Sequence, residues 1–150
     1  MITKRKIADL FIAFGESHNQ VGLTEYSVNH LWEVDKDLES NGAVLWINSV
    51  QGSFTGISAK WNYDIFCMDV INTKEDNSID VESDTYSILL DLMSYFAQYD
   101  YEINFVFTMD RSGTNEPFRE RFSSMYCGNI LRMTITAPFS YNTCKIPYKS

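Results

Sequence analysis

The sequence predicts an α+β fold, in which a mainly antiparallel sheet of about five strands is covered by two helices in the order α-β-β-β-α-β-β. Two apolar patterns, one on each side of an acidic turn, carry this prediction. The first alternates at period two, as in a strand with one face toward a core, and consists of Trp61, Tyr63, Ile65 and Cys67. The second recurs at helical spacing and consists of Ile88, Leu89, Leu92, Met93 and Phe96.

The first helix is expected at about residues 3–17, where four apolar residues form one stripe: Ile7, Leu10, Phe11 and Phe14. The second helix is expected to begin at Ser83, a good N-cap residue, and to run to about Gln98. Asp84 then lies in the first turn, where the helix dipole favours a negative charge. In the sequence, the first helix therefore precedes the first three predicted strands, and the second helix follows them.

The expected strands cover residues 26–34, 43–50, 54–71, 101–110 and 131–137. Gln51-Gly52-Ser53 is expected to reverse the chain before the third strand, in which Gly56 is a candidate bulge. Residues 111–127 are irregular and polar, and we expect them to form a long surface loop. Loops of this length in compact domains are uncommon and tend to be functional, most often in binding. An extended tail is expected after Pro138.

Residues 1–150 have the length of a single domain, and 45% of them are hydrophobic, which is enough to form a core. The net charge of −8 opposes binding to a phosphate backbone, because sequence-independent affinity for nucleic acid comes from Lys and Arg. No stretch approaches the ~20 apolar residues of a membrane span. The apolar run near the N-terminus is interrupted by Asp9 and lacks a cleavage site for a signal peptide. We expect a soluble protein made in a cytoplasm.

No complete set of metal-binding residues is recognisable. Residues 76–80 place oxygen atoms at alternate positions, as in a calcium loop. However, Val81 stands where that loop needs glycine, and Ser87 stands where it needs a bidentate glutamate. A solvated turn followed by a helix cap is therefore expected. His18 and His30 lack partners at ligand spacing, so a helix C-cap and a half-buried ring are the favoured roles.

No catalytic set is recognisable either. The cysteines Cys67, Cys127 and Cys144 form no CxxC pair, so reduced thiols are expected. Cys127 has no recognisable basic partner, which favours a buried inert thiol over a nucleophile. A GxSxG elbow is absent, and residues 52–56 lack the Lys and the spacing of a phosphate loop. The sequence predicts no catalytic residue, metal or cofactor, and thus a protein that is not an enzyme.

A mixed-charge patch on the predicted 111–127 loop is the best candidate for a binding surface. Arg and aromatic side chains are enriched in interfaces, although a solvated surface is an equal alternative. Acidic residues at 75–84 and arginines at 111–132 are segregated along the chain, so these segments are candidate opposite halves of a contact between subunits. The candidate interface residues are Asp76, Asp80, Glu82, Arg111, Phe118, Arg119, Arg121 and Phe122.

Several local strings, in this order of elements, carry a resemblance to a known family. They are Leu45-Trp46-Ile47-Asn48 with the turn Gln51-Gly52-Ser53, Tyr63-Asp64-Ile65 leading to Met68-Asp69, Asn77 to Asp84, Pro117-Phe118, Gly128, and Cys144-Lys145-Ile146-Pro147. Over about residues 3–147 the chain resembles the tail-completion and tail-terminator-like proteins of tailed bacteriophages. The version it resembles is that of phages infecting Bacteroidetes, including crAss-like phages.

The resemblance implies a structural virion protein of the phage tail or neck, which is in the host cell cytoplasm during assembly. Such a protein forms part of a ring, as tail terminator, completion protein or head-tail connector, and links portal and tail components. The implied partners are other copies in a six- or twelve-fold ring and adjacent portal, neck and tail proteins, without a membrane. DNA would pass through the lumen without sequence-specific contacts. Rings closed by heterologous contacts need two different, complementary patches on each subunit.

Two alternatives stay open. The first is a small monomeric enzyme or ligand-binding domain, whose pocket of convergent polar groups would lie between the helices and the sheet. The second is a phage assembly chaperone that leaves before the particle matures. An oligomer favours the ring over the monomeric enzyme, and presence in purified particles favours it over the chaperone.

Overall fold

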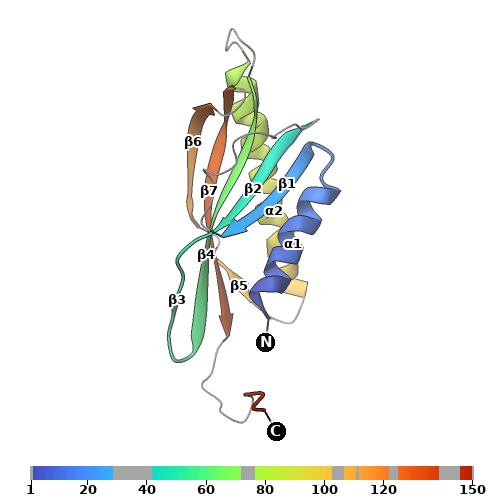
Figure 1. Ribbon diagram of the computed structural model, residues 1–150. Coiled ribbons are helices and arrows are strands. Elements are labelled where there is room, and N and C mark those ends of the chain that lie inside the picture. Colours follow the sequence, from blue (N-terminus) through green and yellow to red (C-terminus); the bar gives the residue numbers. More distant parts are fainter. Residues whose placement is uncertain are drawn as a thin grey trace.

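In this computed structural model of the chain, the described residues are 2–28, 42–71, 77–102, 107–110, 112–121, 125–138 and 146–149. They form two helices, α1 (Lys4–Ser17) and α2 (Ser78–Glu102), and one mixed sheet of seven strands (Figure 1). The strands are β1 (Val21–Val28), β2 (Ala43–Ser49), β3 (Ser53–Phe54), β4 (Ser58–Val70), β5 (Thr108–Met109), β6 (Thr114–Arg121) and β7 (Met125–Pro138). The α+β class is confirmed, whereas the predicted number of about five strands is wrong.

The sheet has the strand order β1-β2-β4-β7-β5, with β3 paired to β4 and β6 paired to β7. β1 and β2 are parallel, and the other described pairs are antiparallel. The sheet is therefore mixed, and the order of elements is α-β-β-β-β-α-β-β-β instead of the predicted order. A parallel pair needs a crossover connection, and the residues between β1 and β2 lie mostly outside the described part of the chain.

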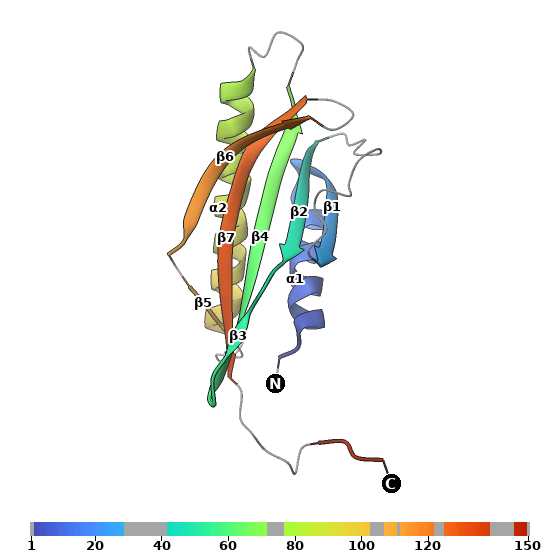
Figure 2. The ribbon, with the colours of Figure 1, turned by 60° about the vertical axis from the view of Figure 1, so that its left-hand side comes forward.

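Both helices lie on the same face of the sheet (Figure 2). The main core fills the space between them and that face, and it contains both apolar patterns that predicted the fold. Of the residues in these two patterns, Trp61 and Met93 are partly buried and the others are fully buried. The opposite face carries a smaller apolar cluster of Val44, Trp46, Phe66, Met68 and Tyr126. The central strands are thus buried on both faces, as a continuous apolar run allows.

The first helix forms where the sequence predicts it. The Thr3 side chain caps its first turn by accepting a hydrogen bond from the Lys6 backbone N–H at 3.2 Å. His18 caps the other end, because its backbone N–H donates to the Phe14 carbonyl at 3.0 Å. A side chain at Gly15 would overlap Thr24, so glycine is what allows α1 to lie this close to β1.

The second helix is longer at both ends than predicted. It begins at Ser78 and not at Ser83, because the Val81 backbone N–H donates to the Asn77 carbonyl at 3.0 Å and the Val81 side chain is buried. The polar first turn obscured this helix start in the sequence. At the other end, the helix includes Tyr101 and Glu102, where a strand was expected. Among the described residues of that expected strand, those that form a strand are β5.

The predicted loop at 111–127 is wrong, because most of it forms the strand β6 and the start of β7. This strand pairs with β7 from Thr114↔Arg132 to Arg121↔Met125. Pro117 lies within it, which is compatible with a strand at the edge of a sheet, where a missing backbone N–H costs little. β7 accordingly begins at Met125, before the predicted start at residue 131. The charged and proline-bearing composition of an edge strand explains why no strand was predicted here.

The predicted chain reversal at Gln51-Gly52-Ser53 is also wrong. The chain continues into β3, and the turn follows at residues 55–57, where the Thr55 hydroxyl accepts hydrogen bonds from the backbone N–H groups of Ile57 and Ser58. The long strand therefore starts at Ser58, and Gly56 belongs to the turn. Similarly, β1 starts at Val21 and not at residue 26, and residues 29–34 of that predicted strand lie outside the described residues.

We predict that Gly128→Ala lowers the free energy of unfolding by about 2–3 kcal/mol, as overpacking does. Gly128 pairs with Met68 in the middle of the sheet, and an added Cβ would overlap the Cys67 carbonyl oxygen, which is backbone and cannot turn away. Urea denaturation measures the change. Gly22→Ala, at an exposed position of β1, is the matched control. Equal stability of the two variants would contradict this account.

Candidate assembly surfaces

The structure describes four candidate interface residues with their side chains. Asp80 and Glu82 lie on the first turns of α2, and Phe118 and Arg119 lie on β6. The backbone of Arg121 ends β6. Asp76, Arg111 and Phe122 are outside the described residues.

A groove runs between the N-terminal half of α2 and β6, and we call it the α2–β6 groove. Two adjoining cavities of about 290 and 500 Å³ form it, and both include Glu82 in their walls. The smaller cavity is lined by Ser78, Glu82, Pro117, Phe118, Arg119, Cys127 and Gly128. The larger cavity is lined by Ile79, Glu82, Ser83, Tyr86, Asn115 and Asn129. The acidic and the Arg-bearing segments, predicted as opposite halves of a contact, thus meet within one chain.

Asn129 on β7 fixes the floor of the groove. It is 1% exposed, and its amide N–H groups donate to the Glu82 carbonyl at 2.8 Å and to the Thr85 hydroxyl at 3.1 Å. Its amide oxygen accepts from Asn115 on β6 at 3.1 Å. One buried amide therefore joins the helix to two strands, and its hydrogen-bonding capacity is used within the fold.

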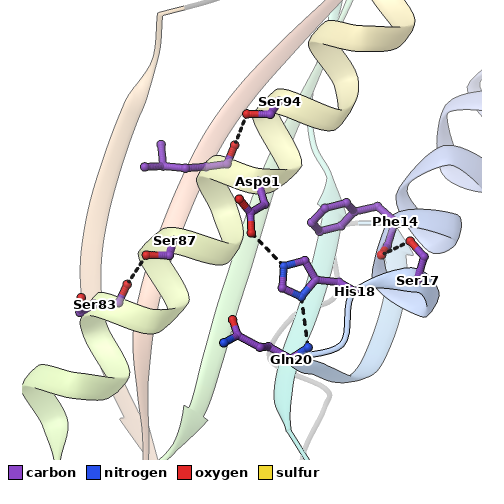
Figure 3. Close-up of polar contacts among 9 residues, drawn as sticks. Phe14, Ser17, His18, Gln20, Ser83, Ser87, Asp91 and Ser94 are labelled. Atoms are coloured by element: carbon purple, nitrogen blue, oxygen red, sulfur yellow. Dashed lines mark hydrogen bonds and ion pairs between the residues drawn. The ribbon is translucent and has the colours of Figure 1, made fainter.

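The rim of the groove on α2 carries exposed apolar side chains beside Glu82. Ile79 is 78% exposed, and Tyr86 and Leu90 follow it on the same side of the helix, at seven and eleven residues further along. The serines between and beyond them turn their hydroxyls to the helix backbone: Ser87 donates to the Ser83 carbonyl and Ser94 to the Leu90 carbonyl, each at 3.1 Å (Figure 3). Sequence analysis missed this stripe, because the buried stripe of the same helix dominates the pattern.

The Phe118 side chain points away from α2 and packs within the fold. Its ring lies edge-on to Phe66 on the opposite face of the sheet, with centroids 5.7 Å apart. On that same face, the Arg132 guanidinium lies 3.2 Å from a Glu116 carboxylate oxygen and 3.8 Å from one of Asp64. The mixed-charge patch is therefore partly paired within the chain, and exposed pairs of this kind contribute about 0–1 kcal/mol.

The two described cysteines are buried and form no disulfide, in agreement with the predicted inert thiols. Burial raises the pKa of the Cys127 thiol; Arg119 lowers it, and Glu82 and Asp69 raise it further. Burial likewise raises the pKa of Cys67 well above its ordinary value. Both thiols are accordingly protonated at neutral pH, which disfavours nucleophilic chemistry. Cys144 lies outside the described residues.

His18 has the structural role that the sequence predicts. Besides capping α1, its ring accepts a hydrogen bond at Nδ1 from the Gln20 backbone N–H at 3.2 Å. Its Nε2 lies 2.9 Å from a carboxylate oxygen of Asp91, which joins the end of α1 to α2 (Figure 3). His30 is outside the described residues. Among the described residues, no group of three or more His, Cys, Asp or Glu is arranged to hold a metal ion.

A second exposed apolar surface is the hairpin tip, residues 53–58 between β3 and β4. Phe54 is 71% and Ile57 81% exposed, and the hairpin projects beyond the rest of the sheet (Figures 1 and 2). The Thr55 turn holds the tip in one conformation, with a backbone hydrogen bond of 2.7 Å from Thr55 to the Ser58 carbonyl. Two large apolar side chains are thus presented on an ordered support.

No protein-family model matches the chain, and no curated protein sequence matches it significantly. In the described part of the chain, no helix combines the length and the hydropathy needed to cross a membrane.

We predict that Asn129→Asp lowers the free energy of unfolding at pH 7 by about 2–4 kcal/mol, because a buried carboxylate replaces the donor to Glu82 and Thr85. Burial raises the pKa of the new carboxyl in the folded state, so protonation at lower pH favours folding and the deficit shrinks as the pH falls. Urea denaturation from pH 5 to 8 measures this. Asn19→Asp, at an exposed position, is the matched control; a deficit independent of pH would refute the explanation.

Proposed function

We propose that this chain is a structural subunit of the neck or tail of a tailed bacteriophage, where copies assemble into a ring that links portal and tail components. One observation carries the proposal: exposed apolar side chains gather on two unlike surfaces, the hairpin tip and the α2–β6 groove. Exposed apolar patches mark interaction sites. The sequence resemblance to tail-completion and tail-terminator-like proteins gives the proposal its setting in the phage particle.

The two surfaces lie at different ends of the molecule. The hairpin tip is at the end where α1 begins and β7 finishes, whereas α2 begins at the opposite end (Figure 2). Two unlike patches at opposite ends suit a heterologous contact that repeats from copy to copy, whereas a twofold dimer would bring both patches of each copy into one interface. Such contacts close into a ring when the rotation between copies allows it. This supports a tail terminator, completion or connector ring.

A small enzyme or ligand-binding domain is the second candidate. A cavity of about 220 Å³ lies beside the junction of α1 and β1 and is lined by Asn19, Gln20, Ala43, Asp69, Val81, Asp84, Thr85 and Ile88. This volume is below the roughly 300–1,000 Å³ of most ligand sites. The cavity holds two carboxylates, yet the described histidine and thiols are engaged elsewhere in the fold. Specific binding of a small molecule by a monomer would favour this candidate.

We predict that the double variant Phe54→Ser/Ile57→Ser raises the dissociation constant of the assembly by about tenfold or more, since burying each such side chain stabilises a contact by roughly 1.5–3 kcal/mol. Size-exclusion chromatography with light scattering, over a range of concentrations, measures the mass. Thermal stability should not change, because both side chains are exposed. Val28→Ser, at another exposed apolar position, is the control; an unaltered mass distribution of the double variant would exclude the hairpin tip from assembly.

Separate experiments test the position of the chain in the phage particle. Mass spectrometry of purified phage particles should detect the chain at several copies per particle, and electron microscopy should locate it at the neck or tail. Detection in infected cells but not in particles would instead favour the assembly chaperone. Absence from both would refute a phage role.

A further inference from the structure

α2 carries exposed acidic side chains next to its exposed apolar rim. The helix contains the acidic residues Asp80, Glu82, Asp84, Asp91, Asp100 and Glu102 and no Lys, Arg or His. Asp80 and Glu82 are exposed in the first turns. Glu82 lines the larger cavity of the α2–β6 groove together with Ile79 and Tyr86 and is its charged side chain, whereas Arg119 lines the smaller cavity. A ligand complementary to this wall would carry apolar or aromatic side chains together with positive charge.

The C-terminal tail of the chain has this chemistry. Ile146 to Lys149 are all exposed, and the Tyr148 side chain is 73% exposed. In the sequence, Lys145 and Lys149 stand on either side of the Ile146-Pro147-Tyr148 segment. The segment is locally ordered by a hydrogen bond of 2.9 Å from the Tyr148 backbone N–H to the Ile146 carbonyl, and Pro147 restricts it further. Such restriction lowers the entropy lost on binding.

The tail can reach the groove of another copy more readily than the groove of its own chain. Asn129 on the groove floor and Pro138 at the end of β7 are nine residues apart, which is about 30 Å of strand. Tyr148 is ten residues beyond Pro138, which is at most about 33–36 Å of extended chain. To reach its own groove, the tail would have to double back fully extended along the sheet. Figures 1 and 2 instead show the C-terminus beyond the end of the sheet, away from the start of α2.

We propose that the C-terminal tail of one copy binds in the α2–β6 groove of the next copy. Tyr148 packs against the apolar rim at Ile79 and Tyr86, and Lys149 lies near the carboxylates of Asp80 and Glu82. The inference rests on the proposed self-assembly for its partner and specifies one of the contacts. A tail that enters the next copy leaves a free groove and a free tail, so the contact can repeat as a heterologous one, whereas reciprocal exchange of tails would close a twofold dimer; the mass of the assembly separates the two arrangements.

A cross-linking experiment tests the proposal. One copy carries Ser83→Cys in the groove and the other Ser150→Cys at the end of the tail, which leaves Tyr148 and Lys149 in place; both carry Cys144→Ser, and Cys67 and Cys127 are buried. Mixed at micromolar concentration under mild oxidation, they should form the disulfide-linked heterodimer at least about tenfold faster than a pair in which Val28→Cys replaces Ser150→Cys. The reason is that bound cysteines meet at an effective concentration of order mM.

Equal rates for the two pairs would overturn the inference. So would a single chain carrying both cysteines that forms its disulfide internally and never between copies, because the tail would then occupy its own groove. Either result leaves the particle experiment, and with it the proposed function, untouched. Conversely, cross-linking between copies of a chain that is absent from phage particles would support the tail contact and refute the phage setting.

A charge exchange supplies the second measurement. Lys149→Glu should raise the dissociation constant of the assembly severalfold, and Glu82→Lys in the same chain should restore it, because the pair is then reversed. Both side chains are exposed, so folding is preserved. Failure of Glu82→Lys to restore assembly would argue against contact between this end of the tail and the groove.

Discussion

The pairing of β4 with β7 is the contact on which the rest of the structure depends. The two strands pair over thirteen residues, from Ser58↔Pro138 to Val70↔Tyr126, and the described strands other than β1 attach directly to one of them. Because side chains alternate along strands, the pair presents Tyr63, Ile65 and Met133 together to the helices. A one-residue shift of register would turn these apolar groups to the opposite face. The hairpin tip leads directly into β4, and the floor of the groove includes Asn129 of β7. The register of the β4–β7 pair therefore sets the distance between the tip and the groove.

The amino-acid pattern predicts those helices and strands in which one face is buried and the other is exposed. The alternation from Trp61 to Cys67 and the helical repeat from Ile88 to Phe96 both identify core faces, because one face of each element contacts the other. The pattern fails where polar residues interrupt it. β6 is charged and contains Pro117, since an edge strand has little to bury. The first turn of α2 alternates polar residues with Ile79 and Val81, and only the burial of Val81 shows that it packs.

Several residues of the candidate site were predictable from the sequence, but not which of them lie close together. Glu82 and Arg119 are both among the residues expected to lie at an interface, and the groove includes both. Their proximity depends on β6 pairing with the following strand β7 and on Asn129 of β7 holding α2, and the second of these contacts joins residues 47 positions apart. Local periodicity carries no information on such pairings. The hairpin tip was missed for a related reason: only the pairing of Ser53 with Lys60 shows that the chain turns after Phe54.

The charge distribution bears on how copies would approach in the assembly proposed above. Described basic residues at the end opposite the start of α2 include Lys4, Arg5 and Lys6 in the first turn of α1, where cations oppose the helix dipole and are not favoured by the helix itself. Arg5 forms an exposed pair with Asp9 at 3.0 Å, and Lys4 lies 5.9 Å from the centroid of the Trp61 ring, so part of this charge is compensated locally. α2, by contrast, carries acidic residues without a basic one. In the assembly proposed above, copies that approach with like ends together would repel each other, whereas an approach of the basic end to α2 of the next copy is attractive, which favours arrangements in which unlike ends meet.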